Sequence, residues 1–212
     1  MKYFKQYLKI LLLCIVTYGF SLAQAGAYED LFAALERDDA RVVTTLLQRG
    51  FDPNSRDEEG QVALFLALRR PAPAVAEALW AHPQLQVDPV NAAGETPLMM
   101  AALRGQVAWM RRLIERGAKP HHEGWSPIHY AATGPEPQAV ALLLERGVPV
   151  DARSPNGTTP LMMAARYGSE RSVALLLQRG ADARLRNQRD LAAADFAREA
   201  GRDALARELA AR

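Results

Sequence analysis

The apolar positions of residues 157–182 recur with the spacing of two short helices. In the sequence GTTPLMMAARYGSERSVALLLQRGAD, Leu161, Ala164 and Ala165 fall on one face of a first helix. Larger apolar residues then mark the buried stripe of a second helix, at Val173, Leu176 and Leu177. Because neither helix could bury its apolar face alone, the segment predicts a helix–turn–helix unit that needs similar units beside it.

The ends of both helices carry residues with specific backbone preferences. Thr159 can cap the first helix, and Pro160 at its first position loses nothing, because that N–H would be unpaired in any case. Glycine suits a left-handed residue at a helix C-terminus, so Gly168 and Gly180 are both expected to have a positive φ. The start and stop signals therefore agree with the apolar spacing.

Two further segments repeat this arrangement. Residues 94–119, GETPLMMAALRGQVAWMRRLIERGAK, match it almost letter for letter, and residues 124–149, GWSPIHYAATGPEPQAVALLLERGVP, match it more loosely. Gly124 and Gly157 are 33 residues apart. This period and the shared TPLxxAA…G…V..LL..GA pattern resemble the ankyrin repeat. The resemblance implies an all-α solenoid of helix–turn–helix units connected by β-turn fingers.

Weaker forms of the pattern extend the resemblance over residues 28–212. We expect an ankyrin-repeat domain of about six repeats, at 28–57, 58–91, 92–121, 122–154, 155–187 and 188–212. The first and last repeats carry many charged residues and are expected to cap the open ends of the solenoid. The connection after Gly117, AKPHHEG, is shorter than its counterparts, so the finger formed there should be trimmed or reshaped.

The N-terminal sequence MKYFKQYLKILLLCIVTYGFSLAQAGA has the layout of a secretory signal peptide. It has a basic start, an apolar run from Ile10 to Phe20, and small residues at the cleavage positions 23 and 25. The run is shorter than the ~20 apolar residues of a membrane-spanning helix. We therefore expect cleavage of residues 1–25 and export to a bacterial periplasm, with retention of the segment as an anchor as the alternative. Cleavage would also remove Cys14, the single cysteine, and leave no thiol for a disulfide.

Charge gives no reason to expect a nucleic acid or an anionic membrane as the partner. The chain has 26 basic and 24 acidic residues. Loss of Lys2, Lys5 and Lys9 with the signal peptide leaves 23 basic residues, so the remaining chain is nearly neutral. We expect no nucleic-acid binding and no stable membrane insertion after cleavage. The resemblance to ankyrin solenoids further implies a monomer.

An enzyme should show a nucleophile, a base or metal ligands that converge on one site, and the sequence presents no such set. We expect no catalytic residue, no cofactor and no metal site. His129 occupies the histidine position of the ankyrin TPLH motif, so the resemblance implies that it ties a finger to a helix. His121 and His122 are adjacent, and neighbours on an extended strand point to opposite faces, which disfavours a shared ion. Contact with a partner remains open for both.

Trp125 is the most informative residue for function. It lies where the neighbouring repeats carry Glu95 and Thr158, so it is expected at an exposed position on a finger. An exposed tryptophan is a favoured binding anchor. The alternative is that the shortened finger folds it back over Pro120.

Two methionine pairs, 99–100 and 162–163, follow Thr-Pro-Leu in two repeats. One member of each pair should face the core and the other the concave groove, where methionine adapts well to a flexible apolar partner. Met100 and Met163 are the groove candidates, with Tyr130 at the corresponding position of the repeat between them. Core packing is the alternative.

In ankyrin proteins, partners usually lie between the finger tips and the first helices of the repeats. The variable residues at these positions include Arg104, Arg166 and Tyr167, with Arg153 on a finger. They predict a locally positive groove suited to an acidic or amphipathic segment, or else a solvated charged face. The implied function is non-catalytic protein binding through the concave face. An inhibitor or immunity protein that blocks a toxin or hydrolase is one alternative, and a metal-handling protein or enzyme is another. Fold does not name the partner.

Overall fold

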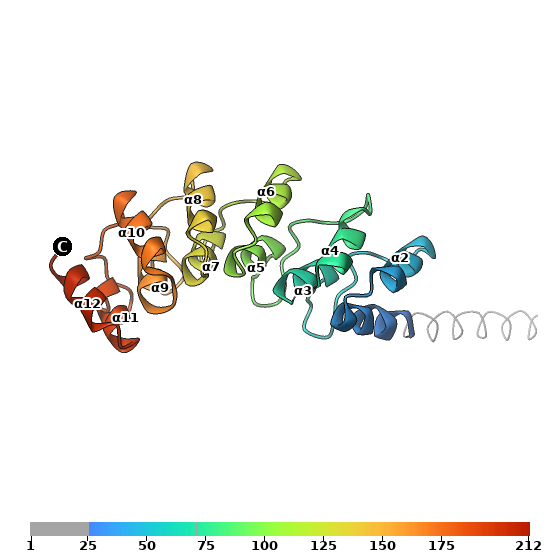
Figure 1. Cartoon of the computed structure of the whole chain (residues 1–212), viewed down its shortest axis with the longest axis horizontal. Coiled ribbons are helices and arrows are strands. Elements are labelled where there is room, and N and C mark those ends of the chain that lie inside the picture. The colour runs from blue at the N-terminus through green and yellow to red at the C-terminus, as the bar shows by residue number, and fades with distance from the viewer. Residues whose placement is uncertain (1–25, 71) are drawn as a thin grey trace, which may run out of the picture.

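Pairs of short helices stack side by side along residues 26–70 and 72–212, the part of the chain that this computed structural model describes (Figure 1). The predicted signal peptide, residues 1–25, lies outside the described residues. Within them all regular structure is helical, apart from a single β-bridge between Arg56 and Val62. The prediction of an all-α solenoid is confirmed.

After a helical segment at residues 26–37, the helices alternate between an outer and an inner row. The inner row contains α3 (Ala63–Arg69), α5 (Pro97–Leu103), α7 (Pro127–Thr133), α9 (Pro160–Tyr167) and α11 (Ala193–Glu199). The outer row contains α2 (Ala40–Gln48), α4 (Pro73–Trp80), α6 (Val107–Glu115), α8 (Pro137–Glu145), α10 (Glu170–Gln178) and α12 (Asp203–Ala210). The stack bends so that the inner row lies on its concave side (Figure 1).

The inner helices begin where the sequence signals predict. The hydroxyl oxygens of Thr96 and Thr159 each accept a hydrogen bond from a backbone N–H three residues later, at 3.3 Å in both cases. A proline occupies the first turn of α5, α7 and α9. Each cap satisfies an N–H that the helix itself leaves unpaired, so the two capping threonines set the start of α5 and α9.

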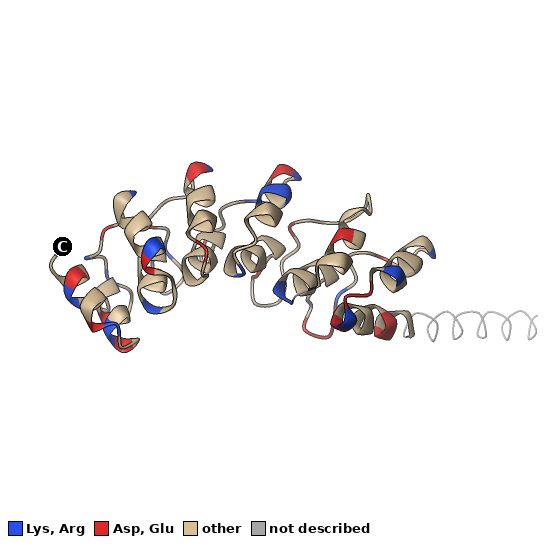
Figure 2. Cartoon of the chain, viewed as in Figure 1, with Lys and Arg blue, Asp and Glu red and all other residues tan. Residues whose placement is uncertain are grey.

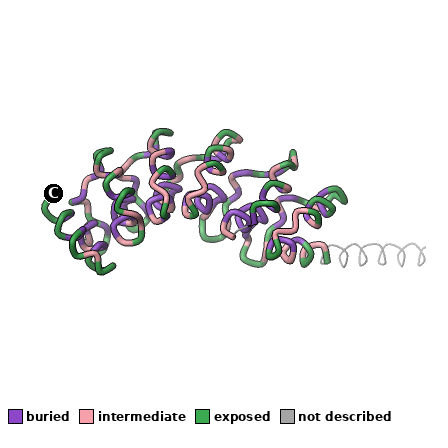
Figure 3. The backbone as a smooth tube through the Cα atoms, in the orientation of Figure 1, coloured by how far each residue is buried: buried purple, intermediate pink, exposed green. Residues whose placement is uncertain are grey.

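Small residues allow the inner helices to approach closely. The alanine pairs 101–102, 131–132 and 164–165 are all fully buried, and a continuous buried core runs between the two rows (Figure 3). Gly168 serves the same purpose, because a Cβ there would lie 2.1 Å from the carbonyl oxygen of Ala132. Its φ is −84°, so the prediction of a left-handed residue at Gly168 is wrong. Gly180, with φ of +90°, does adopt that conformation.

The terminal repeats each support a helix of the next repeat inward. The Asp38 carboxylate accepts hydrogen bonds from the backbone N–H groups of Ala74 and Val75 at the start of α4, at 3.2 and 2.9 Å. At the other end, Arg202 donates to three carbonyl oxygens at the end of α9, those of residues 164, 165 and 168, each at 3.0 Å. An acid at a helix N-terminus and a base at a C-terminus both complement the helix dipole.

Every helix in the described ranges is too short or too polar to cross a lipid bilayer.

Candidate partner-binding surface

A small apolar pocket opens on the concave side of the solenoid. It has a volume of about 260 Å³ and is lined by residues from α5, α7, α9 and one finger: Leu103, Trp125, His129, Tyr130, Thr133 and Met163. We call it the Trp125 pocket. It brings together Trp125, Tyr130 and Met163, three of the residues predicted from the sequence to meet a partner.

The finger that carries Trp125 lacks the turn that the other fingers form. In the finger of the fifth repeat, Ser154 N–H donates to Thr158 O and Gly157 N–H donates to Ser154 O, at 3.0 and 2.8 Å. Equivalent pairs close three more fingers, but residues 118–125, all of which the structure describes, form none. The predicted reshaping of this finger is confirmed. Trp125 is half-buried and meets the His129 ring edge-on, with centroids 5.3 Å apart.

His129 forms the floor beside Trp125 and is held on both ring nitrogens. Nδ1 accepts a hydrogen bond from Ser126 N–H at 3.2 Å, and Nε2 lies 3.0 Å from Ala152 O and 3.1 Å from Thr158 O. Since a carbonyl oxygen can only accept, Nε2 carries the proton and the ring is neutral. Burial lowers the pKa of His129 in agreement. The histidine ties the next finger to α7, as the resemblance implies.

Tyr130 forms the wall on the other side and is fixed by a contact to the preceding finger. Its hydroxyl donates a hydrogen bond to Glu95 Oε1 at 3.1 Å, and the other Glu95 oxygen accepts from Asn91 Nδ2 at 3.0 Å. Burial, followed by the neighbouring Glu95 charge, raises the pKa of Tyr130. The phenol therefore keeps its proton and remains a donor to Glu95, so its ring is preorganised as a pocket wall.

The two groove methionines differ in exposure. Met163 is half-buried and lines the Trp125 pocket. Met100 is only 3% exposed and belongs to the core cluster, so the prediction that it faces the groove is wrong. The Met100 side chain is enclosed within the continuous core, whereas Met163 only packs against the edge of that core.

The predicted positive groove is partly neutralised (Figure 2). Arg166 pairs with Glu199 and lies 5.3 Å from the ring of Tyr167, which is 57% exposed. Arg153 donates a hydrogen bond to the backbone oxygen of Arg186 at 3.2 Å, on the finger row. Arg104, at the end of α5 next to the pocket residue Leu103, is exposed. Of these four predicted residues, none lines the pocket itself, and Arg104 and Arg166 lie within one helical turn of residues that do.

His121 and His122 also lie outside the pocket lining. His121 Nδ1 is 3.3 Å from Ser126 Oγ, and His122 Nε2 is 3.8 Å from the Asp88 carboxylate. Burial raises the pKa of Asp88. In the described part of the chain no three histidine, cysteine or acidic side chains converge as metal ligands would. His121 thus contacts its own finger, and the His122 ring faces the preceding one.

Two lining residues, Leu103 and Thr133, lie at the variable last-turn positions of α5 and α7. Repeat alignment places them on the groove, but nothing in their residue types singles them out. A second hollow near Tyr28 and Phe32 was not predicted at all. Its one sequence signal is a pair of aromatic residues in a capping repeat that should be polar.

Known proteins match this chain through the same repeats. It is 37% identical to NF-kappa-B inhibitor delta of Mus musculus over 114 residues. This aligned region covers 50% of this chain and 34% of that protein. It is 35% identical over 120 residues to the transient receptor potential cation channel subfamily A member 1 of Homo sapiens, covering 55% of this chain and 11% of that protein. The chain thus spans about a third or less of these relatives.

A solved structure matches over a greater length. It is a chain in the complex of the Bd0816 predatory endopeptidase from Bdellovibrio bacteriovorus with the immunity protein Bd3460. The match has a TM-score of 0.71 and 26% identity, and covers 86% of this chain and 97% of that chain. The family model described as ankyrin repeats (3 copies) matches residues 31–123 and 111–187. With most of its length matched in this way, the chain belongs to the ankyrin-repeat family.

Proposed function

We propose that this protein is a non-catalytic binding module that captures a partner protein on its concave face. The Trp125 pocket receives one apolar side chain of that partner. The membership in a family of protein-binding repeats supports the general role, and the pocket supports the place.

The observation that carries the proposal is the size and lining of the pocket. Its volume of about 260 Å³ is below the ~300–1,000 Å³ of typical small-molecule sites, which favours a single side chain over a free ligand. Trp125 and Tyr130 present aromatic surface and Met163 a polarisable sulfur, so an aromatic anchor fits best. The exposed guanidinium of Arg104 favours a carboxylate beside that anchor.

The second candidate is an inhibitor or immunity protein that blocks a toxin or hydrolase. The observation that favours it is the likeness to a chain in the complex of an endopeptidase with an immunity protein, which extends over almost all of that chain. In this case the captured segment belongs to the enzyme that is blocked. The two candidates share one surface. They are separated by measuring the activity of a purified hydrolase from the same cell with this protein bound: loss of activity supports the inhibitor or immunity protein.

The place of action in this proposal is the bacterial periplasm. Its support is the sequence of residues 1–25 alone. Sequencing the N-terminus of the protein from cells tests it: a start at Gly26 supports cleavage and export, and a start at Met1 with the protein in the membrane fraction supports the anchor.

Affinity capture with the protein as bait, followed by mass spectrometry, tests the binding surface. Trp125→Ala should weaken capture about thirtyfold, because a buried aromatic anchor contributes ~2 kcal/mol or more to binding. The matched control is Arg171→Ala on the outer helix α10, where the side chain is exposed and far from the pocket. Capture that survives Trp125→Ala in a protein with an unchanged melting temperature would exclude the Trp125 pocket.

A further inference from the structure

Two buried side-chain atoms face each other where the reshaped finger 118–125 meets the finger before it. His122 Nε2 lies 3.8 Å from Asp88 Oδ1, and neither atom has a hydrogen-bond partner within the described ranges. At this distance the two atoms form no hydrogen bond with each other. A buried polar atom without a partner destabilises the fold, so the gap marks an incomplete contact between the two fingers.

One proton is missing from this contact. The second carboxylate oxygen of Asp88 already accepts a hydrogen bond from Lys119 N–H, at 3.3 Å. Burial raises the pKa of Asp88, in agreement with an Oδ1 atom that has lost water without gaining a donor. A proton taken up from solvent by the His122 ring supplies that donor, because an imidazolium Nε2–H can form a charge-assisted hydrogen bond to the carboxylate.

The position of finger 118–125 depends on contacts with its surroundings, because no backbone hydrogen bond joins two of its own residues. One of these contacts is the hydrogen bond from His122 N–H to Ser126 Oγ, at 3.4 Å. Ser126 N–H in turn donates to His129 Nδ1 at 3.2 Å, and Trp125, directly before Ser126, meets the His129 ring. A short path of contacts thus joins the buried pair to the Trp125 pocket.

The other charged and titratable groups of the same finger form no ion pair with His122 or Asp88. Lys119 and Glu123 are exposed, and the charge of Lys119, like that of a protonated His122, favours an ionised Asp88. His121 is exposed as well, and its Nδ1 lies near Ser126 Oγ. His122 and Asp88 therefore have each other as the available charged partner.

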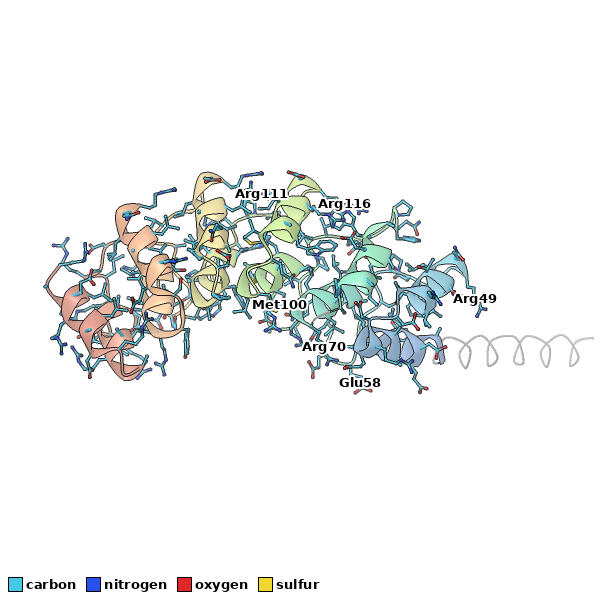
Figure 4. The ribbon with its side chains drawn as sticks, viewed as in Figure 1. Arg49, Glu58, Arg70, Met100, Arg111 and Arg116 are labelled. Carbon is cyan, nitrogen blue, oxygen red and sulfur yellow. The ribbon has the colours of Figure 1, made fainter. Side chains whose placement is uncertain are left out.

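The charged groups on the neighbouring elements have other partners. At the end of α6, Arg116 donates to two carbonyl oxygens at the end of α4 (Figure 4). On the adjacent fingers, Glu95 accepts from the Tyr130 hydroxyl and Arg153 donates to a backbone oxygen of the finger after it. In α7, burial lowers the pKa of His129, so this ring takes up its proton at a lower pH than an ordinary histidine.

We propose that the Asp88–His122 pair is a proton-operated latch on the Trp125 pocket. Uptake of one proton closes the gap between Nε2 and Oδ1 to a hydrogen bond, fixes finger 118–125 against the finger before it, and holds Trp125 in the position that receives the partner. A pocket that is already in its binding conformation binds more tightly. This inference rests on the proposed function and adds its regulation: capture is stronger in mildly acidic than in mildly alkaline solution.

Nuclear magnetic resonance tests the latch without a partner. Between about pH 7.5 and pH 6, around the ~6.5 of an ordinary histidine, the indole N–H signal of Trp125 should shift together with the ring signals of His122. The shift of the Trp125 signal should disappear in His122→Gln and in Asp88→Asn, which keeps an oxygen for Lys119 N–H. His121→Gln is the matched control and should leave the shift in place.

The free tyrosine side chain, p-cresol, serves as the probe for the pocket. It should bind about fivefold more tightly at about pH 6 than at about pH 7.5, near the lower end of typical coupling between two sites. Asp88→Asn should remove this difference and leave the affinity at its value for the higher pH. Trp125→Ala should lose the binding at both pH values, since the variant lacks one wall of the pocket.

The outcomes separate the latch from the proposed function. A Trp125 signal that still shifts in His122→Gln, or p-cresol binding with no pH dependence, would overturn the latch and leave the proposed function intact. A normal shift in a protein whose capture of partners is insensitive to Trp125→Ala would overturn the proposed function and the link to capture, but not the latch. Failure of p-cresol to bind at either pH would overturn the pocket as the receptor of an aromatic side chain.

Discussion

Two junctions between neighbouring repeats are held together by different means. Between α7–α8 and α9–α10, the inner helices come so close that only glycine fits at residue 168, and the outer helices α8 and α10 also pack. Between α3–α4 and α5–α6, the outer helices α4 and α6 approach at few points or none. Side chains bridge them instead: Trp80 and Trp109 meet edge-on at 5.4 Å, and Arg112 lies over both rings at 4.8 and 4.1 Å.

The difference follows from residue size. At the position where α5, α7 and α9 carry Ala102, Ala132 and Ala165, α3 carries Leu68. Leu68 is fully buried. Its side chain fills space that, beside the alanines, is open to the backbone of the neighbouring helix. Arg112 also pairs with Glu77, at 2.8 Å between Nη2 and Oε2, and both groups are exposed enough for water to weaken the pair. In a solenoid, each interface adds its own stabilisation, so the α4/α6 junction should be the weaker one.

The largest effect is expected at the tight junction. Gly168→Ala should lower the free energy of unfolding by ~3 kcal/mol, at the upper end for overpacking, because the added methyl meets the backbone oxygen of Ala132 rather than a movable side chain. Urea unfolding followed by circular dichroism measures this.

Gly50→Ala is the control for that variant. Gly50 has a φ of +88° but nothing within 4 Å of a Cβ, so alanine there costs only backbone strain, ~1–2 kcal/mol. If Gly50→Ala proves as damaging as Gly168→Ala, close approach of the backbones does not explain the tight junction.

A smaller but more selective effect is expected at the bridged junction. Arg112→Met keeps apolar cover on the two tryptophans but loses their cation–π contacts and the Glu77 pair, at a cost of ~1 kcal/mol. The weakened interface should let the first two repeats unfold before the rest, so tryptophan fluorescence should change at lower urea than circular dichroism. Arg111→Met, on the same helix but exposed, should leave the two transitions coincident; separate transitions in both variants would contradict this role of Arg112.

The smallest expected effect is the pH dependence of the stability of the C-terminal half. The folded-state pKa of His129 is lowered by burial, so its neutral form stabilises the fold fully above the unfolded value of ~6.5, and this contribution is lost as the pH falls below it. The melting temperature should be lower at pH 5 than at pH 7, and less so in His129→Gln. Glu77, Asp182 and Asp195 have lowered pKa values and matter only in more acidic solution. An unchanged pH dependence in His129→Gln would assign the effect to other groups.

The fold could be predicted because its information is local. Thr159, Pro160 and the apolar spacing define each helix pair, and the repetition of the pair defines the solenoid. Gly168 marks the limit of this reasoning. The sequence pattern predicts a backbone preference for this glycine, whereas the structure requires it because a carbonyl oxygen of the preceding repeat lies too close for any side chain.

The binding surface could be predicted only in part. Trp125, Tyr130 and Met163 occupy variable positions of known geometry in the repeat, so alignment placed them on the groove. Met100 has the same position in its own repeat and is nevertheless buried, a difference that the repeat pattern does not indicate. The ion pair of Arg166 with Glu199 joins two repeats, and no pattern within one repeat indicates it.

The contacts of Asp38 and Arg202 bear on how such a chain changes its length in evolution. Each terminal repeat is joined to its neighbour by one charged side chain. Asp38 contacts the start of α4, and Arg202 contacts the end of α9. A duplicated unit inserted between α5 and α8 would leave both contacts untouched. Internal gene duplication can therefore lengthen the groove, and widen the choice of ligands, while the same two ends continue to close the domain.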